Sequence, residues 1–332
     1  MEAIIVLEVH EEGLARVRQS LGAAGVHLLQ VNDQIDYEVP PALARRCEIL
    51  FANFVPRNLP EMNRLRWLQL GSAGYEQIIG RGLPAMGVRV TSGSGANDIP
   101  IAEWCLTTML LFERHILTLL ENQRQKIWER AACFQQELRG RRVGIVGYGN
   151  IGRVVAGLAT ALGLEVWASA RGPIGPRPHR YVLPGTGDPN GTLPHRTFRL
   201  EEMDAFLPSL DYLVLTLPRT LATEGLLGTR ELRLMKPTAV LINPSRAQLV
   251  QEEALLQALR EGWIAGAALD VHYAYPLPPS HPLWDMPNVI LTPHISGSNG
   301  SRHYLERLWD IFASNVTRYL AGEPLLNDLA AS

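Results

Sequence analysis

The chain has 332 residues, of which 46% are hydrophobic and 19% are charged, and its formal net charge is −2. A chain of this length is expected to form about two domains with buried cores. The near-neutral charge excludes a strong field for nucleic acid or an anionic membrane, and no apolar run is long enough to span a bilayer. Neither nucleic acid nor a membrane is therefore an expected partner.

The three cysteines, Cys47, Cys105 and Cys133, are far apart and form no CxxC pair. An odd, scattered set of this kind is typical of a reducing compartment and gives no metal site. The acidic N-terminal stretch MEAIIVLEVHEE lacks the features of a signal peptide. These observations predict a cytoplasmic protein without a bound metal.

The first 95 residues alternate short apolar runs with helical patterns. The runs that indicate buried strands lie at 4–8, 27–31, 48–53 and 65–70. Strands that alternate with helices are typical of parallel βαβ units, so we expect a doubly wound sheet.

Residues 98–120 are predicted to form one long, mostly apolar helix that connects two domains. Beyond it, strand-like and helical segments alternate again, and 298–320 is predicted to be a helix that returns to the first domain. We therefore predict an α/β fold with two doubly wound parallel-sheet domains. One is discontinuous, 1–97 plus 296–332, and the other spans 98–295.

Residues 172–195, GPIGPRPHRYVLPGTGDPNGTLPH, interrupt this alternation where a short connection would suffice. A loop of this length is either mobile or functional. Its residues suggest no chemistry, so we interpret it as a surface insertion whose role stays open.

The stretch VGIVGYGNIG places a GxGxxG pattern at Gly147, Gly149 and Gly152. The pattern alone is weak, but here it follows a predicted strand and opens a predicted helix, which is the context of a dinucleotide-binding turn. The glycines allow a tight turn, close approach to a pyrophosphate and close helix packing, and the helix start at Asn150 and Ile151 offers N–H groups to the phosphates. A glycine turn without a ligand is the alternative.

An NAD site of this type has Asp or Glu about 20 residues further on, which holds the ribose 2′-hydroxyl. Here the next strand ends in Ser169, Ala170 and Arg171. Without an acid there is no repulsion against a 2′-phosphate, and an arginine and a hydroxyl can both bind one. We predict that NADP(H) is preferred and that NAD(H) is possible. Alternatively, Arg171 points to solvent and the choice of cofactor is loose.

Three later segments carry reactive side chains at the ends of predicted strands: Arg246 in INPSRAQLV, Asp270 in AALDV and His294 in LTPHISG. Open α/β sheets bind ligands at these ends. An arginine can clamp a carboxylate, and a histidine can give a proton to an oxygen as hydride reaches the carbon. Singly, these residues are more often surface or core residues. Together, behind a dinucleotide turn, they favour a redox site.

With these motifs in order, the chain resembles the D-isomer-specific 2-hydroxyacid dehydrogenases over nearly its whole length. The resemblance implies a Rossmann cofactor domain and a flavodoxin-like substrate domain. It further implies hydride transfer between NADP(H) and a small 2-keto or 2-hydroxy acid, such as glyoxylate or hydroxypyruvate, and a homodimer formed largely through the second domain. The shared segments are LQLGSAGYE, GANDIPIAEW, ELRGRRVGIVGYGNIG, LTLPRTLATEGLL, INPSRAQLV, AALDV and NVILTPHISG.

The resemblance also implies residue roles. Arg246 and His294 would be catalytic, and Asn97 would contact substrate or cofactor at the hinge. The substrate carboxylate would be held by backbone N–H groups at Ser72, Ala73 and Gly74. The cofactor site would be lined by Leu217, Pro218, Pro244, Ser245 and Asp270, the last of these beside the nicotinamide carboxamide.

Two positions depart from the family pattern. The usual Arg-Gly is Arg246-Ala247 here, a mild change if Ala247 keeps a negative φ. The glutamate that family members place before a proline, where it hydrogen-bonds the catalytic histidine, is replaced by Tyr275. Tyrosine is neutral at pH 7, so it can orient the imidazole but supplies no charge.

We therefore predict that His294 donates a proton without a carboxylate partner, with an apparent pKa near or below the reference value of about 6.5. An acid from another segment, Asp285 being the nearest in sequence, is the alternative. Two other functions stay open. One is a catalytically weak dinucleotide-binding sensor or scaffold, which the missing glutamate favours. The other is a formate-type dehydrogenase, whose hydride transfer needs no proton donor.

Overall fold

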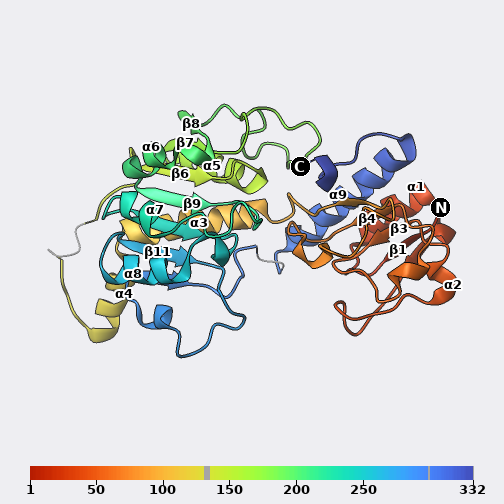
Figure 1. The fold of residues 1–332 in the computed structure, drawn as a ribbon, viewed down its shortest axis with the longest axis horizontal. Helices are drawn as coiled ribbons and strands as arrows, with labels where there is room; N and C mark the ends of the chain where they lie inside the picture. Colours follow the sequence, from red (N-terminus) through yellow and green to blue (C-terminus); the bar gives the residue numbers. More distant parts are fainter. Residues whose placement is uncertain (131–134, 298–299, 332) are drawn as a thin grey trace. The chain divides into compact units, whose positions relative to one another are not determined.

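The computed structural model describes residues 1–130, 135–297 and 300–331. These residues form two compact units (Figure 1). Unit 1 comprises 1–97, 177–183 and the described part of 299–332, and unit 2 comprises the described residues of 98–176 and 184–298. Each unit is built on a parallel sheet, as the alternating sequence pattern predicts.

The sheet of unit 1 has five parallel strands in the order β2-β1-β3-β4-β5. The direction of winding reverses between β1 and β3, as in flavodoxin-like folds, and ligands bind beyond the carboxyl ends of such sheets. Four of the five strands were predicted from the sequence, and β5 was not. The strands are β1 (Ala3–Ile5), β2 (Val26–Leu28), β3 (Ile49–Phe51), β4 (Trp67–Gln69) and β5 (Arg89–Thr91).

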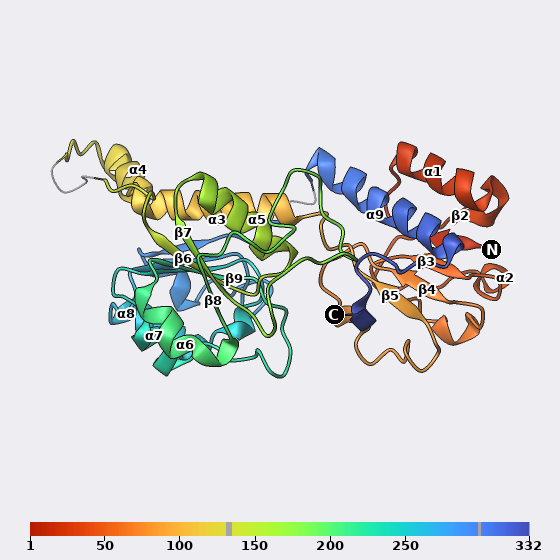
Figure 2. The same cartoon turned by 90° about the horizontal axis from the view of Figure 1, so that it is seen from above.

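Two long helices of unit 1, α1 (Glu11–Leu21) and α9 (Arg302–Ala321), lie side by side along its sheet (Figures 1 and 2). The aromatic face of α9 packs on the sheet, with the rings of Phe312 and Phe51 stacked 4.2 Å apart. The short helix α2 (Pro41–Ala44) belongs to the core on the other side, which also contains Leu50 and Leu68. The C-terminal helix is therefore part of the first domain's core.

The sheet of unit 2 has seven parallel strands in the order β12-β11-β10-β9-β6-β7-β8. The winding reverses between β6 and β9, which is the Rossmann arrangement and places the expected ligand crevice at that point. The strand β8 was not predicted. The strands are β6 (Arg142–Val146), β7 (Glu165–Ser169), β8 (Arg196–Phe198), β9 (Tyr212–Leu215), β10 (Val240–Asn243), β11 (Gly266–Leu269) and β12 (Val289–Leu291).

Helices cover both faces of this sheet (Figure 2). On one face lie α3 (Asp98–Glu113) and α5 (Asn150–Ala161), and on the other α6 (Met203–Phe206), α7 (Thr229–Leu234) and α8 (Glu252–Arg260). Both faces of the strands are thus buried, which explains why their sequences are almost continuously apolar.

The predicted single helix over 98–120 is wrong. The structure has two helices, α3 and α4 (Ile116–Gln125), and His115 between them is left-handed with a φ of 49°. The last residue of α3, Glu113, is buried and accepts hydrogen bonds from Arg141 at 2.7 and 3.0 Å and from the hydroxyl of Tyr212. These tertiary bonds hold the end of α3 against the sheet, and the chain turns away after it.

The segment 172–195, interpreted as a surface insertion, is exposed or half-buried except at Tyr181 and Asp188, but it is divided between the two units. Its middle part, Arg177–Leu183, belongs to unit 1, whereas the residues before and after it belong to unit 2. Tyr181 is only 8% exposed, and its N–H donates to the side-chain oxygen of Asn327 at 3.1 Å. We call residues 172–195 the strap, because this segment is anchored in both units.

Candidate active site

The GxGxxG turn lies between β6 and α5, where the strand order of unit 2 reverses. Gly147 has a φ of 98°, a conformation that glycine adopts without strain. A Cβ atom on Gly152 would clash with the carbonyl oxygen of Gly147, so α5 can pack this closely on the turn only because Gly152 has no side chain. Gly147 itself packs against Thr216 and Leu217, which follow β9.

The start of α5 can receive a phosphate group. The helix begins at Asn150, and Gly149 before it provides no capping side chain. The first hydrogen bond of the helix runs from the N–H of Arg153 to the carbonyl oxygen of Gly149 at 3.1 Å. The N–H groups of the helix residues before Arg153 therefore have no acceptor within the helix. These groups and the positive end of the helix dipole suit a pyrophosphate. The residues present therefore fit a dinucleotide.

The end of β7 carries no acidic residue. Ser169 is fully buried, and its hydroxyl oxygen has no hydrogen-bond partner among the described residues. Its carbonyl oxygen accepts from the N–H of Gly147 at 2.8 Å, which fixes the end of β7 beside the turn. Arg171 is exposed. Of the two residues predicted to bind a 2′-phosphate, only Arg171 therefore has side-chain surface available in this structure.

Arg246 follows β10 at the carboxyl edge of the unit 2 sheet, and Asn243 shapes the backbone around it. The amide oxygen of Asn243 accepts from the N–H and hydroxyl of Ser245 at 3.1 and 3.0 Å, and its amide nitrogen donates to the carbonyl of Arg246 at 2.9 Å. Ala247 opens a short 3-10 helix (Ala247–Leu249) and is not left-handed. The missing glycine after Arg246 therefore causes no backbone strain.

Asp270 follows β11 and holds the loop that carries His294. It is 0% exposed, and its carboxylate accepts from the hydroxyl of Thr292 at 2.6 Å and from the N–H groups of Ile295 and Ser296 at 2.8 and 2.9 Å. These partners flank His294 on both sides. The same carboxylate thus fixes a left-handed residue, since His294 has a φ of 58°. The predicted contact of Asp270 with the nicotinamide carboxamide stays a prediction.

Tyr275 lies beside His294. The centroids of the two rings are 5.6 Å apart and their planes are inclined by 46°. The hydroxyl of Tyr275 accepts from the backbone N–H of His272 at 3.2 Å, so the phenol is attached to the strand end that also carries Asp270. Tyr275 and His294 are in contact through their tilted rings, and the hydroxyl oxygen of Tyr275 is hydrogen-bonded to His272 instead. Tyr275 can therefore orient the imidazole by ring packing.

His272 is a site residue that the sequence reasoning missed. It is 6% exposed, and its Nε2 lies 2.8 Å from the carbonyl oxygen of Thr292. Because a carbonyl only accepts, Nε2 is the donor in this contact. Nδ1 is buried without a hydrogen-bond partner among the described residues. The only signal in the sequence was a histidine two residues after Asp270.

The alternative carboxylate, Asp285, ends a short 3-10 helix (Pro282–Asp285). The structure gives no hydrogen bond or ion pair between Asp285 and His294, both of which are described residues. The alternative that an acid takes the place of the family glutamate beside His294 stays open.

In unit 1, the segment after β4 presents backbone donors. The hydroxyl of Ser72 donates to the carbonyl of Gly74 at 2.7 Å, and the side chain of Gln77 donates to that hydroxyl at 3.0 Å. Within the described chain, the N–H groups of Ser72, Ala73 and Gly74 donate to no protein acceptor. They can bind a carboxylate, as predicted for the substrate. Asn97, the last residue of unit 1 before α3, is half-buried.

Of the predicted cofactor residues after β9 and β10, Leu217 and Ser245 are buried and Pro218 is exposed. Pro244 is buried between Asn243 and Ser245. All four lie at the carboxyl edge of unit 2, on the strands next to the glycine turn and Arg246. The structure thus brings these predicted residues to one edge of one sheet.

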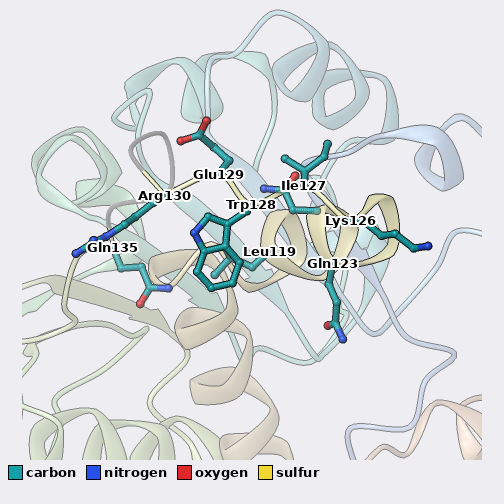
Figure 3. A pocket seen from close by; sticks show the side chains of 9 residues that line it. Leu119, Gln123, Lys126, Ile127, Trp128, Glu129, Arg130 and Gln135 are labelled. Carbon is teal, nitrogen blue, oxygen red and sulfur yellow. The ribbon is translucent and has the colours of Figure 1, made fainter.

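A pocket of about 670 Å³ lies away from this edge, on α4 and the segment after it. Its lining includes Leu119, Ile127 and Trp128 (Figure 3). None of the predicted catalytic or cofactor residues contributes to it. Among the described residues, no helix has the length and apolarity to cross a membrane. The described chain likewise has no group of three or more His, Cys, Asp or Glu side chains placed to hold a metal ion.

Comparison with known proteins identifies the class that this fold and site define. The family model "D-isomer specific 2-hydroxyacid dehydrogenase, NAD binding domain" matches residues 106–296, more than half of the chain. The chain is 32% identical to a glyoxylate reductase of Thermofilum pendens, over 78% of this chain and 73% of that protein. It is 28% identical to a glycerate dehydrogenase of Methylorubrum extorquens, over 92% and 95% of the two chains.

A solved structure supports the same assignment. The D-isomer specific 2-hydroxyacid dehydrogenase of Xanthobacter autotrophicus Py2, in complex with NADPH and MES, has a TM-score of 0.77 with this chain at 26% identity. The match covers 99% of this chain and 97% of that one. The protein belongs to the D-isomer specific 2-hydroxyacid dehydrogenase family. It is an NAD(P)-dependent oxidoreductase that interconverts 2-hydroxy and 2-keto acids, so the sensor and formate-type alternatives are not favoured.

Proposed function

We propose that the protein is an NADP(H)-preferring reductase of small 2-keto acids such as glyoxylate or hydroxypyruvate. The observation that carries the proposal is the edge of the unit 2 sheet. Arg246 follows β10 and the His294 loop follows β12, and Asp270, at the end of the strand between them, holds that loop by three hydrogen bonds. The names of the relatives, glyoxylate reductase and glycerate dehydrogenase, suggest acids of this size.

In the proposed reduction of a keto acid, each residue has a separate role. The bound nicotinamide supplies the hydride for the carbonyl carbon of the keto acid. Arg246 attracts the substrate carboxylate and polarises the carbonyl. Protonated His294 gives its proton to the carbonyl oxygen, so that the ketone becomes a hydroxyl and the imidazole becomes neutral. In unit 1, the N–H groups of Ser72, Ala73 and Gly74 are available to bind a carboxylate, which stays a prediction for the substrate.

The preference for NADP(H) is supported by the absence of an acid after β7 and by the exposed Arg171. A guanidinium can form two parallel hydrogen bonds with a 2′-phosphate, which NADH lacks. Arg171→Ala is expected to raise the Kd of NADPH about 10-fold, a change of about 1.4 kcal/mol, and to leave that of NADH unchanged. Fluorescence titration of both cofactors measures this. Equal losses for the two cofactors would refute the role of Arg171.

A substrate panel tests the activity itself. Initial rates of NADPH and NADH oxidation are measured with glyoxylate, hydroxypyruvate and pyruvate, and NADP⁺ reduction is measured with formate. The proposal expects higher kcat/KM with NADPH for the two smaller or hydroxylated keto acids and no formate oxidation. Formate turnover, or NADPH binding without turnover of any keto acid, would contradict it.

We also infer a homodimer that uses α4 and the segment after it. None of the residues of α4 is buried in the single chain, and Trp128 is 97% exposed. Exposed apolar side chains gathered in this way mark an interface, and the occupant we propose is a second copy of the chain. Light scattering should give a dimeric mass, and Trp128→Ser combined with Leu120→Ser should shift it towards a monomer. A monomeric wild type at micromolar concentration would refute the dimer.

A cytoplasmic location is supported by the cysteines. Cys47 and Cys105 are free and buried, and burial raises the pKa of the Cys47 thiol to about 12. Such thiols are unreactive and suit a reducing compartment. Cell fractionation tests this, and recovery of the protein outside the cytoplasm would refute it.

A further inference from the structure

The strap is fastened to the dinucleotide turn of unit 2 through Asp188. This residue is 4% exposed, and its carboxylate accepts from the N–H groups of Thr192 and Leu193 at 2.9 and 3.0 Å. It also accepts from the hydroxyl of Tyr148 at 2.7 Å. Tyr148 is the middle residue of the Gly147–Gly149 turn, so a side chain of the turn is bonded to the strap.

Arg153, in the first turns of α5, fastens both arms of the strap to the same place. Its guanidinium donates to the carbonyl oxygen of Gly175 in the first arm at 2.7 Å and to that of Asp188 in the second arm. Its Nε donates to the carbonyl of Tyr148 at 3.3 Å. Arg153 is buried, and a buried guanidinium that loses its hydrogen-bond partners is costly. The strap and the turn therefore stabilise each other.

The middle of the strap is fastened in unit 1 at Asn327, which is fully buried. Asn327 accepts from the N–H of Tyr181 at 3.1 Å and donates its own N–H to the carbonyl of His179 at 2.9 Å. Its amide nitrogen donates to the carbonyls of Ser92 and Ser94 at 3.1 and 2.8 Å. The same asparagine therefore holds the strap and the segment through which the chain leaves unit 1 for α3.

Packing reinforces this anchor. A Cβ atom on Gly95 would lie 2.5 Å from the Cδ1 atom of Tyr181, so the tyrosine ring rests on the backbone of the departing segment. Tyr181 belongs to the core cluster that includes Ala96 and the aromatic residues of α9. Removing the ring would leave a cavity in unit 1 and release the strap there.

The links between the two anchors are short. Two peptide units join Gly175 to Arg177, and five join Leu183 to Asp188. At about 3.6 Å for each residue these links reach at most about 7 and 18 Å. If Arg177 or Leu183 moves farther than these links can extend, Gly175 or Asp188 must move with it. The hydrogen bonds that Arg153 and Tyr148 make to the strap are then strained.

We propose that the strap couples the dinucleotide-binding turn of unit 2 to the segment by which the chain leaves unit 1. Tyr181 and Asn327 are its positioning residues in unit 1, and Asp188 and Arg153 are those in unit 2. When the strap is docked in unit 1, it holds the turn in the shape that binds the cofactor. The proposal rests on dinucleotide binding alone and is independent of the substrate and of the preference for NADPH.

Cofactor binding without turnover tests the coupling. The Kd values of NADPH and NADH are measured by fluorescence titration for the wild type, Tyr181→Ala, Tyr148→Phe and the double variant. Tyr181→Ala is expected to weaken both cofactors about 5-fold or more, although its residue lies in the other unit. The double variant should be no weaker than about the weaker single variant, because both changes break one connection.

Two further variants separate coupling from loss of structure. Insertion of four glycines into each link, between Pro176 and Arg177 and between the exposed Pro184 and Gly185, keeps both anchors but lengthens both links, and it should weaken the cofactors as Tyr181→Ala does. Tyr319→Ala is the matched control, because Tyr319 stacks on Trp67 in unit 1 at 5.5 Å and is not part of the strap. It should lower the stability of unit 1 and leave both Kd values unchanged.

The outcomes are distinct. Hydrogen exchange shows whether 185–193 loosens in each variant. A loosened strap with unchanged Kd values, unchanged Kd values after the glycine insertion, or additive losses in the double variant would overturn the proposal. A wild type that binds neither cofactor would instead overturn the proposed enzymatic function.

Discussion

Two buried aspartates, Asp270 and Asp188, use the same chemistry in two regions of unit 2. Each carboxylate accepts one hydroxyl and two backbone N–H groups, from Thr292, Ile295 and Ser296 in one case and from Tyr148, Thr192 and Leu193 in the other. Asp270 fixes the loop that presents His294, whereas Asp188 fixes the strap to the dinucleotide turn.

The difference lies in what each carboxylate holds. Around Asp270, a charged acceptor stabilises a loop whose exposed residue must reach the substrate. Around Asp188, it joins two segments of the chain, neither of which reacts. Changes at the first aspartate should therefore appear in the chemical step, and changes at the second should appear in cofactor binding.

The largest expected effect concerns the residue that Asp270 presents. His294→Gln removes the proton donor and should lower kcat/KM for glyoxylate by about 10²- to 10⁴-fold. The Kd of NADPH should stay within about 2-fold of the wild type, because the histidine is not part of the dinucleotide turn. Initial rates and fluorescence titration measure the two quantities. A variant that retains more than a tenth of the wild-type activity would show that another group donates the proton.

Next come the matched substitutions Asp270→Asn and Asp188→Asn, each of which leaves a buried donor without its acceptor, at a cost of about 1–3 kcal/mol. We expect Asp270→Asn to lower kcat about 10-fold or more at saturating cofactor. Asp188→Asn should instead raise the Kd of NADPH and leave kcat within about 2-fold. Steady-state kinetics at varied cofactor concentration separates the two. The reverse pattern would contradict the division of roles.

The substitution Tyr275→Glu places a carboxylate beside His294. A negative charge favours the imidazolium, which keto-acid reduction requires, so the fall of kcat/KM with rising pH should move up by about one pH unit. Tyr275→Phe keeps a neutral ring and serves as the control, with no shift expected. The measurement is kcat/KM against pH for the wild type and the two variants. A glutamate variant with the wild-type profile would show that position 275 does not act on the proton donor.

The smallest effect concerns stability in acid. The pKa of Asp188 lies below its ordinary value: burial raises it, but the N–H groups of Leu193 and Thr192 and the hydroxyl of Tyr148 lower it more. A carboxylate with a lowered pKa stabilises the fold above its unfolded pKa of about 3.9, and this contribution disappears as the pH falls through the folded value.

The unfolding free energy of the wild type should therefore exceed that of Asp188→Asn by a constant amount from pH 5 to 8. The gap should narrow below about pH 4. Urea unfolding at several pH values measures it. A gap that changes between pH 6 and 8 would mean that another group titrates in the strap.

The sequence predicted the region of Asp270 far better than the region of Asp188. The glycines of the turn, Arg246 and His294 each lie in a short local pattern next to a strand. The strap has no such pattern, and its bonds join residues 35 and 40 positions apart in a stretch of prolines and glycines. Only the folded chain brings Tyr148, Arg153 and Asp188 together.

The errors in the fold have similar causes. The strands β5 and β8 were missed because each is a three-residue edge strand that begins with an arginine, too short to show a period. The break between α3 and α4 has no glycine or proline to mark it. It depends on Glu113, whose partners Arg141 and Tyr212 come from distant segments.

The most direct test of the whole account is the product of a single reaction. Hydroxypyruvate and NADPH are incubated with the protein, and D-glycerate, L-glycerate and NADP⁺ are quantified by chiral chromatography and absorbance. D-glycerate alone is expected, formed in a one-to-one ratio with NADP⁺. Formation of L-glycerate, or NADPH binding with no glycerate formed, would contradict it.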